Sequence, residues 1–300
     1  ETIRGCPYKC TFCNSPDQIT MYKENNGSNF FRKKSISLVY NELKHFKEDL
    51  GVEYNYFWAD TFLAWSPDEF EEFCEMYKDI GLPFWMQTRP ETVSDYKIKK
   101  LADVGLHRIS FGIEHGNEGF RKKLLERHWK NKDIIEALKI PHRHGVQFSL
   151  NNITGFPTET RELAMDTVEL NRNIDSDNQN LYSYVPFHGT PLRKLCEDTG
   201  LVAPETITKA LTDKPMLIMP QYPQHEIEGL IKCFTLYVKF PKNRWKEIKK
   251  AEADTPEGSK IYEELKQEYI EKYLPKTNND LEESSAAADL EYGVEQTEVC

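Results

Sequence analysis

Short runs rich in aromatic and β-branched side chains alternate along the chain with longer amphipathic segments. The runs lie at residues 54–58, 83–87, 107–113, 146–153 and 181–187, and their composition predicts β-strands. Between them, apolar side chains recur every three or four positions, which predicts helices at 37–50, 67–80, 95–104, 132–144 and 160–174. Ser66 and Glu69 form a capping box at the start of the second of these helices, and Gly81 ends it. In the fourth, Pro141 should kink or end the helix.

This alternation predicts an α/β fold with parallel strands. Successive strands start 24 to 39 residues apart, which is the length of one βα unit. Right-handed crossovers between such units give a barrel or a doubly wound sheet. With a sixth strand near residues 1–4, we expect a partial (β/α)6 TIM-like barrel that carries a helical C-terminal extension.

We expect three regions along the chain. Residues 1–192 hold the alternating pattern and should form the core barrel. Residues 193–275 read as helical and aromatic-rich, and we expect them to cover the open mouth of the barrel or the substrate. Residues 276–300 carry seven acidic side chains and one lysine, which predicts a disordered acidic tail.

Composition narrows the function classes. The 300 residues carry a net charge of -10, which opposes binding to duplex nucleic acid through its phosphates. No stretch approaches the roughly 18 apolar residues that a membrane-spanning helix needs. Seven cysteines, an odd number with no signal peptide before them, favour a reducing cytoplasm over a disulfide framework. The first residue is Glu1, and the chain begins already inside an expected strand and its loop, as if it were cut from a longer protein.

Three of the cysteines, Cys6, Cys10 and Cys13, lie within eight residues in the motif CPYKCTFC. Thiolates this close repel one another unless a cation shares their charge, so the motif predicts a metal site that holds zinc or an iron-sulfur cluster. A structural zinc site takes four ligands, and the chain has no second CxxC pair. Three ligands leave one metal position open, which favours a cluster that binds a substrate or cofactor. Cys74 reads as a core residue from its helix face. Cys196 and Cys233 lie far apart without paired spacing, which argues against a second cluster, and Cys300 lies in the tail.

The Cx3Cx2C spacing after a first strand resembles the hallmark of the radical S-adenosylmethionine superfamily. The resemblance implies a 4Fe-4S cluster on the three thiolates, with S-adenosylmethionine bound to the open iron. It further implies an electron donor such as a flavodoxin or ferredoxin, reductive cleavage of the cofactor, and a 5'-deoxyadenosyl radical that attacks the substrate. Phe12, just before the third cysteine, matches the aromatic residue that lies beside the adenine in that family.

Secondary motifs carry the resemblance through about residue 250, and they are most similar to the members that have an upstream cobalamin-binding domain, which this chain lacks. ISFGIEHGNE places Glu114 where the family uses a carboxylate to hold the ribose or amino acid part of the cofactor. ITGFPTET resembles the motif whose backbone, near Ile153 and Gly155, flanks the adenine. At the second strand WAD replaces the usual Gly-Gly-Glu, so Asp60 would bind the cofactor's amino group less directly or face the substrate.

Several of these residues also have plainer interpretations. Asp60 could simply cap a turn, and Arg89, before Pro90, could bind a loop carboxylate as readily as a substrate. His115 and His188 follow strand ends and are candidates to face the substrate, although a lone histidine more often only forms hydrogen bonds. The basic run Arg121–Lys123 reads as a solvated surface.

We therefore expect a radical S-adenosylmethionine enzyme that acts on a small molecule or a peptide, with cobalamin-dependent methyl transfer as the leading reaction. Two alternatives remain open at this point. One is a non-catalytic zinc-binding or scaffold protein on the same barrel. The other is a methylthiotransferase acting on transfer RNA, which the neutral to acidic C-terminal region makes less favourable.

Overall fold

The computed structural model describes residues 1–25, 27 and 29–274, and the predicted acidic tail lies outside this range. The strands are β1 (Ile3–Arg4), β2 (Arg32–Lys33), β3 (Asn55–Phe57), β4 (Phe84–Thr88), β5 (Leu106–Glu114), β6 (Gln147–Thr154) and β7 (Asn178–Ser183). The α-helices are α1 (Ser15–Glu24), α2 (Ile36–Glu48), α3 (Pro67–Ile80), α4 (Asp95–Ala102), α5 (Glu118–Leu124), α6 (Asn131–Ala137), α7 (Ile140–Arg143), α8 (Arg161–Arg172), α9 (Pro191–Asp198), α10 (Gln224–Lys239), α11 (Trp245–Ala251) and α12 (Pro256–Lys272). Two short 3-10 helices span Pro90–Thr92 and Lys242–Arg244.

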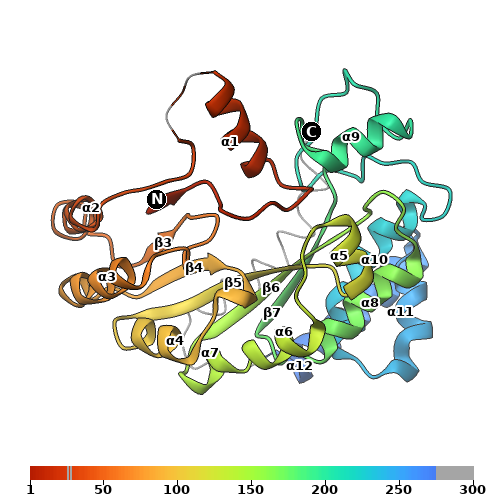
Figure 1. Ribbon diagram of the computed structural model, residues 1–300. Coiled ribbons are helices and arrows are strands. Elements are labelled where there is room, and N and C mark those ends of the chain that lie inside the picture. Colours follow the sequence, from red (N-terminus) through yellow and green to blue (C-terminus); the bar gives the residue numbers. More distant parts are fainter. Residues whose placement is uncertain (26, 28, 275–300) are drawn as a thin grey trace.

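The centre of the molecule is a five-stranded sheet in the order β3-β4-β5-β6-β7, with every neighbouring pair parallel (Figure 1). Each parallel connection needs a crossover, and helices α3 to α8 lie in these crossovers along the chain. The predicted α/β fold, an open partial barrel, is therefore confirmed. Because consecutive parallel strands lie side by side, their C-terminal ends meet at one edge of the sheet.

The N-terminal strand is placed differently from the prediction. β1 pairs antiparallel with β2, with Ile3 opposite Lys33, and these two strands form a separate sheet within the described residues. The backbone of Thr2 also accepts a hydrogen bond from Lys34 N at 3.0 Å, so residues 32–34 supply the partner edge. β1 therefore does not extend the five-stranded sheet.

The helix signals in the sequence match the structure closely. α3 has the predicted bounds, Ser66 and Glu69 form the capping box, and Gly81 ends the helix at a φ of 60°. The segment that contains Pro141 is split into α6 and α7, and Pro141 lies in the first turn of α7, as expected for a residue that cannot donate a backbone hydrogen bond.

The two faces of the sheet differ. Phe57, Met86 and Phe111 point to the side that the crossover helices cover, and all three are buried in one hydrophobic core. Alternate residues point to the other side, where Tyr56 is 44% exposed. Tyr56 contacts Trp58 and Trp85 there, with ring centroids 5.8 and 5.0 Å apart.

The C-terminal helices share a second core with the last part of the sheet. α10 packs against α8 and β7, and Leu230 and Phe234 of α10 join Val168 and Leu181 in that core. These helices thus pack at the β7 side of the sheet, and α9 rises beside α1 above it (Figure 1). The domain division stays a prediction, although position 192 lies inside α9. None of the described helices is long and apolar enough to cross a membrane.

Candidate active site at the C-terminal edge of the sheet

The three clustered cysteines lie on the loop between β1 and α1. Gly5, at a φ of 80°, turns the chain out of β1, in a conformation that a side chain would strain. Cys6 and Cys10 are buried and Cys13 is partly buried. A turn between Cys13 N and Cys10 O, 3.2 Å long, draws the last two cysteines together.

Contacts from three different segments fix this loop across the C-terminal ends of the strands. Thr11 O accepts a hydrogen bond from Leu192 N at 3.1 Å, at the start of α9. Thr11 Oγ1 donates to Leu124 O at the end of α5, at 2.5 Å. After β3, Cys6 Sγ lies 3.3 Å from Thr61 Oγ1, and Asp60 Oδ2 accepts from Ser15 Oγ at 3.1 Å. The sulfur-bearing loop is therefore held where the active sites of barrel enzymes lie.

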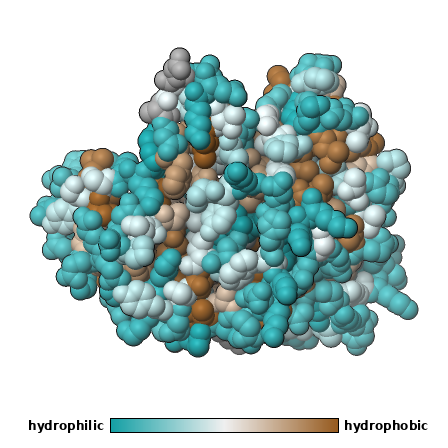
Figure 2. Space-filling view, viewed as in Figure 1, coloured by the Kyte–Doolittle hydropathy of each residue, from teal (hydrophilic) through white to brown (hydrophobic). Residues whose placement is uncertain are grey.

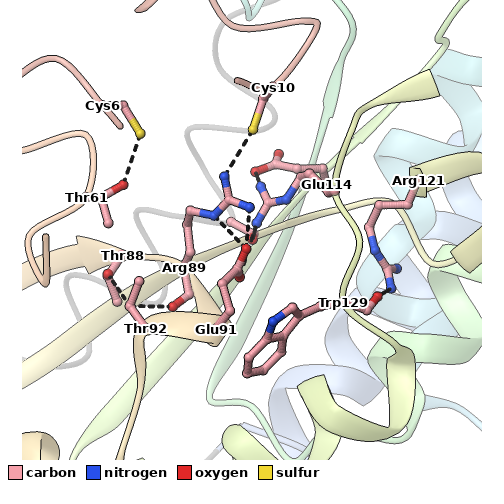
Figure 3. A network of polar contacts seen from close by, with 12 residues as sticks. Cys6, Cys10, Thr61, Thr88, Arg89, Glu91, Thr92, Glu114, Arg121 and Trp129 are labelled. Carbon is pink, nitrogen blue, oxygen red and sulfur yellow. Dashed lines mark hydrogen bonds and ion pairs between the residues drawn. The ribbon is translucent and has the colours of Figure 1, made fainter. Parts of the chain in front are cut away.

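Directly after β4, Arg89 reaches the loop. Its Nη1 donates to Cys10 Sγ at 3.2 Å, and its guanidinium lies over the Tyr8 ring, 3.7 Å from the centroid (Figure 3). Arg89 Nε donates to Glu91 Oε1 at 2.8 Å. Arg89 thus binds a nearby carboxylate, as its plainer interpretation expects, and its contact with a substrate stays a prediction.

A second arginine continues the network toward β5. Arg127 Nη2 lies 3.9 Å from Glu91 Oε2, and Arg127 Nη1 donates to Glu114 Oε1 at 2.6 Å. Glu114 ends β5 with an unusual φ of 70° at an irregularity in the strand register. Figure 3 shows Glu114 pointing toward the Arg89 and Cys10 side of the network.

Burial and the two arginines act on the carboxyl groups in opposite directions. Burial raises the pKa of Glu114, although Arg127 and Arg89 oppose the shift. For Glu91, burial also acts to raise the pKa, but Arg127 and Arg89 together outweigh it and hold the pKa below its usual range. Of the two carboxyl groups, Glu91 is therefore the one held firmly as a carboxylate.

The buried cysteine thiols would lose their protons only if a bound metal took their negative charge. Burial raises the pKa of Cys13 to about 12 and that of Cys10 to a lesser degree, and neighbouring cysteines add to both shifts. Mutually repelling buried thiols are neutral unless a metal takes their charge. Among the described residues, no three His, Cys, Asp or Glu side chains converge on a position for one metal ion. Three soft sulfur donors on one short loop have the chemistry that an iron-sulfur cluster takes, in which each thiolate binds a different iron.

Three other residues expected near the cofactor are Phe12, on the cysteine loop, and Ile153 and Gly155, at the end of β6. Phe12 contacts Phe156 edge to face, with centroids 6.0 Å apart. Ile153 is half-buried in β6, and Gly155 follows that strand at a φ of 81°. Phe12 and the backbone after β6 therefore lie together, as the resemblance implies.

The two histidines lie in different environments. His115 is fully buried, its Nε2 lies 3.0 Å from Glu159 Oε1, and its Nδ1 accepts from Asn117 N at 3.0 Å. This environment favours a structural role for His115. His188 is exposed in the loop after β7. Neither environment tests a contact with the substrate, so the substrate-facing role of His115 and His188 stays a prediction.

Some site residues escaped the sequence analysis. Glu91 and Arg127 were not singled out, and neither was Glu159, which is fully buried and accepts from Gly155 N and Phe156 N at 2.5 and 2.9 Å. The sequence carries no signal for Glu159, because glutamate is not among the residues that commonly bind neighbouring backbone groups. The predicted solvated surface at Arg121 is wrong, because Arg121 is 1% exposed and donates to His115 O at 2.6 Å.

Comparisons with known proteins identify the family to which this chain belongs. The family model described as "Radical SAM superfamily" matches residues 1–170. An uncharacterized methyltransferase of Pyrococcus horikoshii is 25% identical over 252 residues, which cover 82% of this chain and 52% of the relative. A tRNA-2-methylthio-N(6)-dimethylallyladenosine synthase of Halalkalibacterium halodurans is 26% identical over 209 residues, covering 66% of this chain and 37% of the relative.

Among solved structures, the radical S-adenosylmethionine methyltransferase TsrM of Kitasatospora setae, with cobalamin and a [4Fe-4S] cluster bound, has a similar fold. Its TM-score is 0.54 at 17% identity, over 75% of this chain and 42% of TsrM. The chain thus spans about half or less of the proteins it matches. Because the family model covers more than half of the chain, and the cysteine motif lies at the sheet edge where the chemistry of such barrels takes place, this protein belongs to the radical SAM superfamily of enzymes.

Proposed function

We propose that this chain is the catalytic core of an enzyme that holds a 4Fe-4S cluster on Cys6, Cys10 and Cys13 and binds S-adenosylmethionine beside it. When bound, the cluster supplies the electron that cleaves S-adenosylmethionine into methionine and a 5'-deoxyadenosyl radical. The observation that carries the proposal is the set of three thiols on one loop at the C-terminal edge of the sheet, two of them buried and one in contact with Arg89.

The residues around the loop have distinct parts in this proposal. Arg127 orients Glu114 through the 2.6 Å hydrogen bond to Oε1, and we propose that the carboxylate binds the ribose or amino group of the cofactor. Phe12 and the backbone at Ile153 and Gly155 would contact the adenine. Asp60, which is exposed and bonded to Ser15, is the proposed contact near the amino group or the substrate.

The substrate would approach through the hollow between the α1 and α9 regions. Figure 2 shows this notch on the molecular surface, and hydrophobic side chains are exposed on its walls. Gly189, in the loop before α9, lies against Asp17 of α1, where an added Cβ would be 2.0 Å from Asp17 Oδ2. The proposed substrate is a small molecule or a peptide, and a flavodoxin or ferredoxin would supply the electron.

Anaerobic reconstitution tests the core proposal. The wild-type chain should hold about four irons and four sulfides, and it should form 5'-deoxyadenosine from S-adenosylmethionine with a strong reductant. Cys10→Ala should lose both properties. Cys74→Ala is the matched control, because Cys74 is a buried thiol on α3 outside the loop. Stoichiometric zinc without iron in the wild type, or full turnover by Cys10→Ala, would refute the proposal.

For the reaction itself we propose cobalamin-dependent methyl transfer, supported by the methyltransferase relative and by the fold of TsrM. Transfer of the methyl group to cobalamin converts S-adenosylmethionine into S-adenosylhomocysteine, whereas reductive cleavage alone gives methionine. Adding cobalamin that a reductant has brought to its Co(I) form should therefore produce S-adenosylhomocysteine and methylcobalamin. The second candidate is methylthio transfer to transfer RNA, favoured by the likeness to the synthase, and it predicts product formation only when transfer RNA is added.

A further inference from the structure

The contact between Arg89 and Cys10 joins two groups that are each buried. Arg89 and Cys10 are both 8% exposed, and Arg89 Nη1 donates to Cys10 Sγ at 3.2 Å. A buried guanidinium needs partners for its donors, because an unpaired buried charge is costly. A neutral thiol is a weak acceptor, whereas a thiolate that shares charge with a metal is a far better one.

The rest of the network fixes the direction of Arg89. Its Nε and Nη2 both bind Glu91, and the flat face of the guanidinium lies on Tyr8 of the cysteine loop. Only Nη1 is left to face the loop, and the sulfur of Cys10 is its partner. Arg127 does not compete for that sulfur, since its two terminal nitrogens donate to Glu114 and to Gly112 O.

We infer that Arg89 is a positioning residue that acts through the Cys10 thiolate to raise the reduction potential of the cluster. The inference rests on the proposed function, because it needs a cluster on Cys10. Reduction adds one negative charge to the cluster, and a buried cation beside one of its thiolates stabilises the reduced form more than the oxidised form. Hydrogen bonds to the sulfurs act in the same direction.

The test is a redox titration of the reconstituted protein, followed by electron paramagnetic resonance of the reduced cluster. Arg89→Met removes the charge and the donor, and Arg89→Lys keeps the charge but loses the planar fork that Glu91 and Tyr8 orient. Arg108→Met is the matched control. Arg108 lies near the start of β5, at the opposite end of the sheet, and forms no ion pair with a described residue.

In Arg89→Met, at a fixed applied potential, the ratio of reduced to oxidised cluster should fall about tenfold, which is a shift of about 59 mV to more negative potential. Arg89→Lys should lie between this variant and the wild type, and Arg108→Met should match the wild type. A cluster in Arg89→Met with the wild-type midpoint would overturn the inference and leave the proposed function intact. Folded Arg89 variants that bind no cluster would also overturn it, because Arg89 would then be needed for assembly. Failure of the wild type to bind a cluster would refute the proposed function itself.

Discussion

Four ionisable side chains form a continuous line beside Cys10: Arg89, Glu91, Arg127 and Glu114. The two arginines are buried and the two glutamates are partly buried, and each arginine lies beside a carboxyl group, as a buried charge requires. The line connects the thiol expected to bind the cluster with the carboxylate expected to bind S-adenosylmethionine. A change at either end should therefore affect how the other end is oriented.

Glu114 gives the first prediction. Glu114→Gln removes the negative charge that Arg127 holds in place, so we expect S-adenosylmethionine to bind the cluster-loaded protein about tenfold more weakly, a loss of about 1.4 kcal/mol. Isothermal titration calorimetry measures this change. Iron content should stay at the wild-type level, and Glu48→Gln, on the exposed side of α2, should bind normally. Unchanged affinity in Glu114→Gln would remove Glu114 from the cofactor site.

Glu91 gives a prediction about pH. Its pKa is lowered in the folded protein from a usual value of 4.5, so the unfolded chain binds a proton more readily than the folded chain. The stability that the Glu91 carboxylate contributes is present at neutral pH and is lost as the pH falls through the folded-state pKa. When the pH is lowered from about 6 to about 3.5, the unfolding free energy measured by urea denaturation should fall more in the apo wild type than in Glu91→Gln. Parallel losses in the two proteins would contradict this account.

At the scale of elements, the connection from β5 to α5 depends on a close approach between backbones. A Cβ on Gly116 would lie 2.1 Å from Asp166 O and 2.5 Å from the Cα of Thr167, both on α8. Gly116 N also donates to Thr167 Oγ1 at 2.9 Å. Gly116 therefore lies directly against α8. This contact fixes the backbone path that follows Glu114 at the end of β5.

Gly116→Ala should push α8 away from this connection. We expect a loss of roughly 3 kcal/mol of unfolding free energy, in the range of severe overpacking, measured by urea denaturation. Gly119→Ala is the matched control, because Gly119 lies in α5 and an added Cβ there would meet only Asn117 Oδ1 at 3.4 Å. That variant should be neutral or up to about 1 kcal/mol more stable, since alanine favours helices. Equal effects at the two glycines would contradict the close-packing argument.

At the scale of the whole molecule, one buried carboxylate joins the C-terminal helices to the barrel. Glu252, at the end of α11, accepts hydrogen bonds from Arg161 Nη1 at the start of α8 (3.1 Å) and from Tyr237 Oη on α10 (2.6 Å). Because three helices meet at this side chain, we expect the barrel and the C-terminal helices to unfold together.

Glu252→Gln leaves Arg161 without its charged partner, and we expect it to cost about 3 kcal/mol of unfolding free energy. Tryptophan fluorescence, which includes Trp245 in α11, and far-ultraviolet circular dichroism should give the same, lowered midpoint. Glu264→Gln, an exposed carboxylate on α12 with only a 4.0 Å ion pair, should behave like the wild type. Separate midpoints for the two signals would show that the C-terminal helices unfold independently.

Features that depend on near neighbours in the chain could be predicted from the order of the residues. The capping box at Ser66, the helix break at Pro141 and the cysteine spacing are all local, and each could be read without knowing the fold. The parallel order of the strands followed from the length of the connections between them, because a crossover helix fixes the direction of the next strand.

Contacts between groups that are distant in the sequence could not be predicted and emerge from the fold. The pairing of β1 with β2, the burial of Arg121 and the line from Cys10 to Glu114 all depend on contacts between residues far apart in the sequence or on backbone turns that propensity does not encode. A charged residue looks the same in a sequence whether it is solvated or buried. Its partner becomes visible only when the fold brings the two together, because burial makes that pairing necessary.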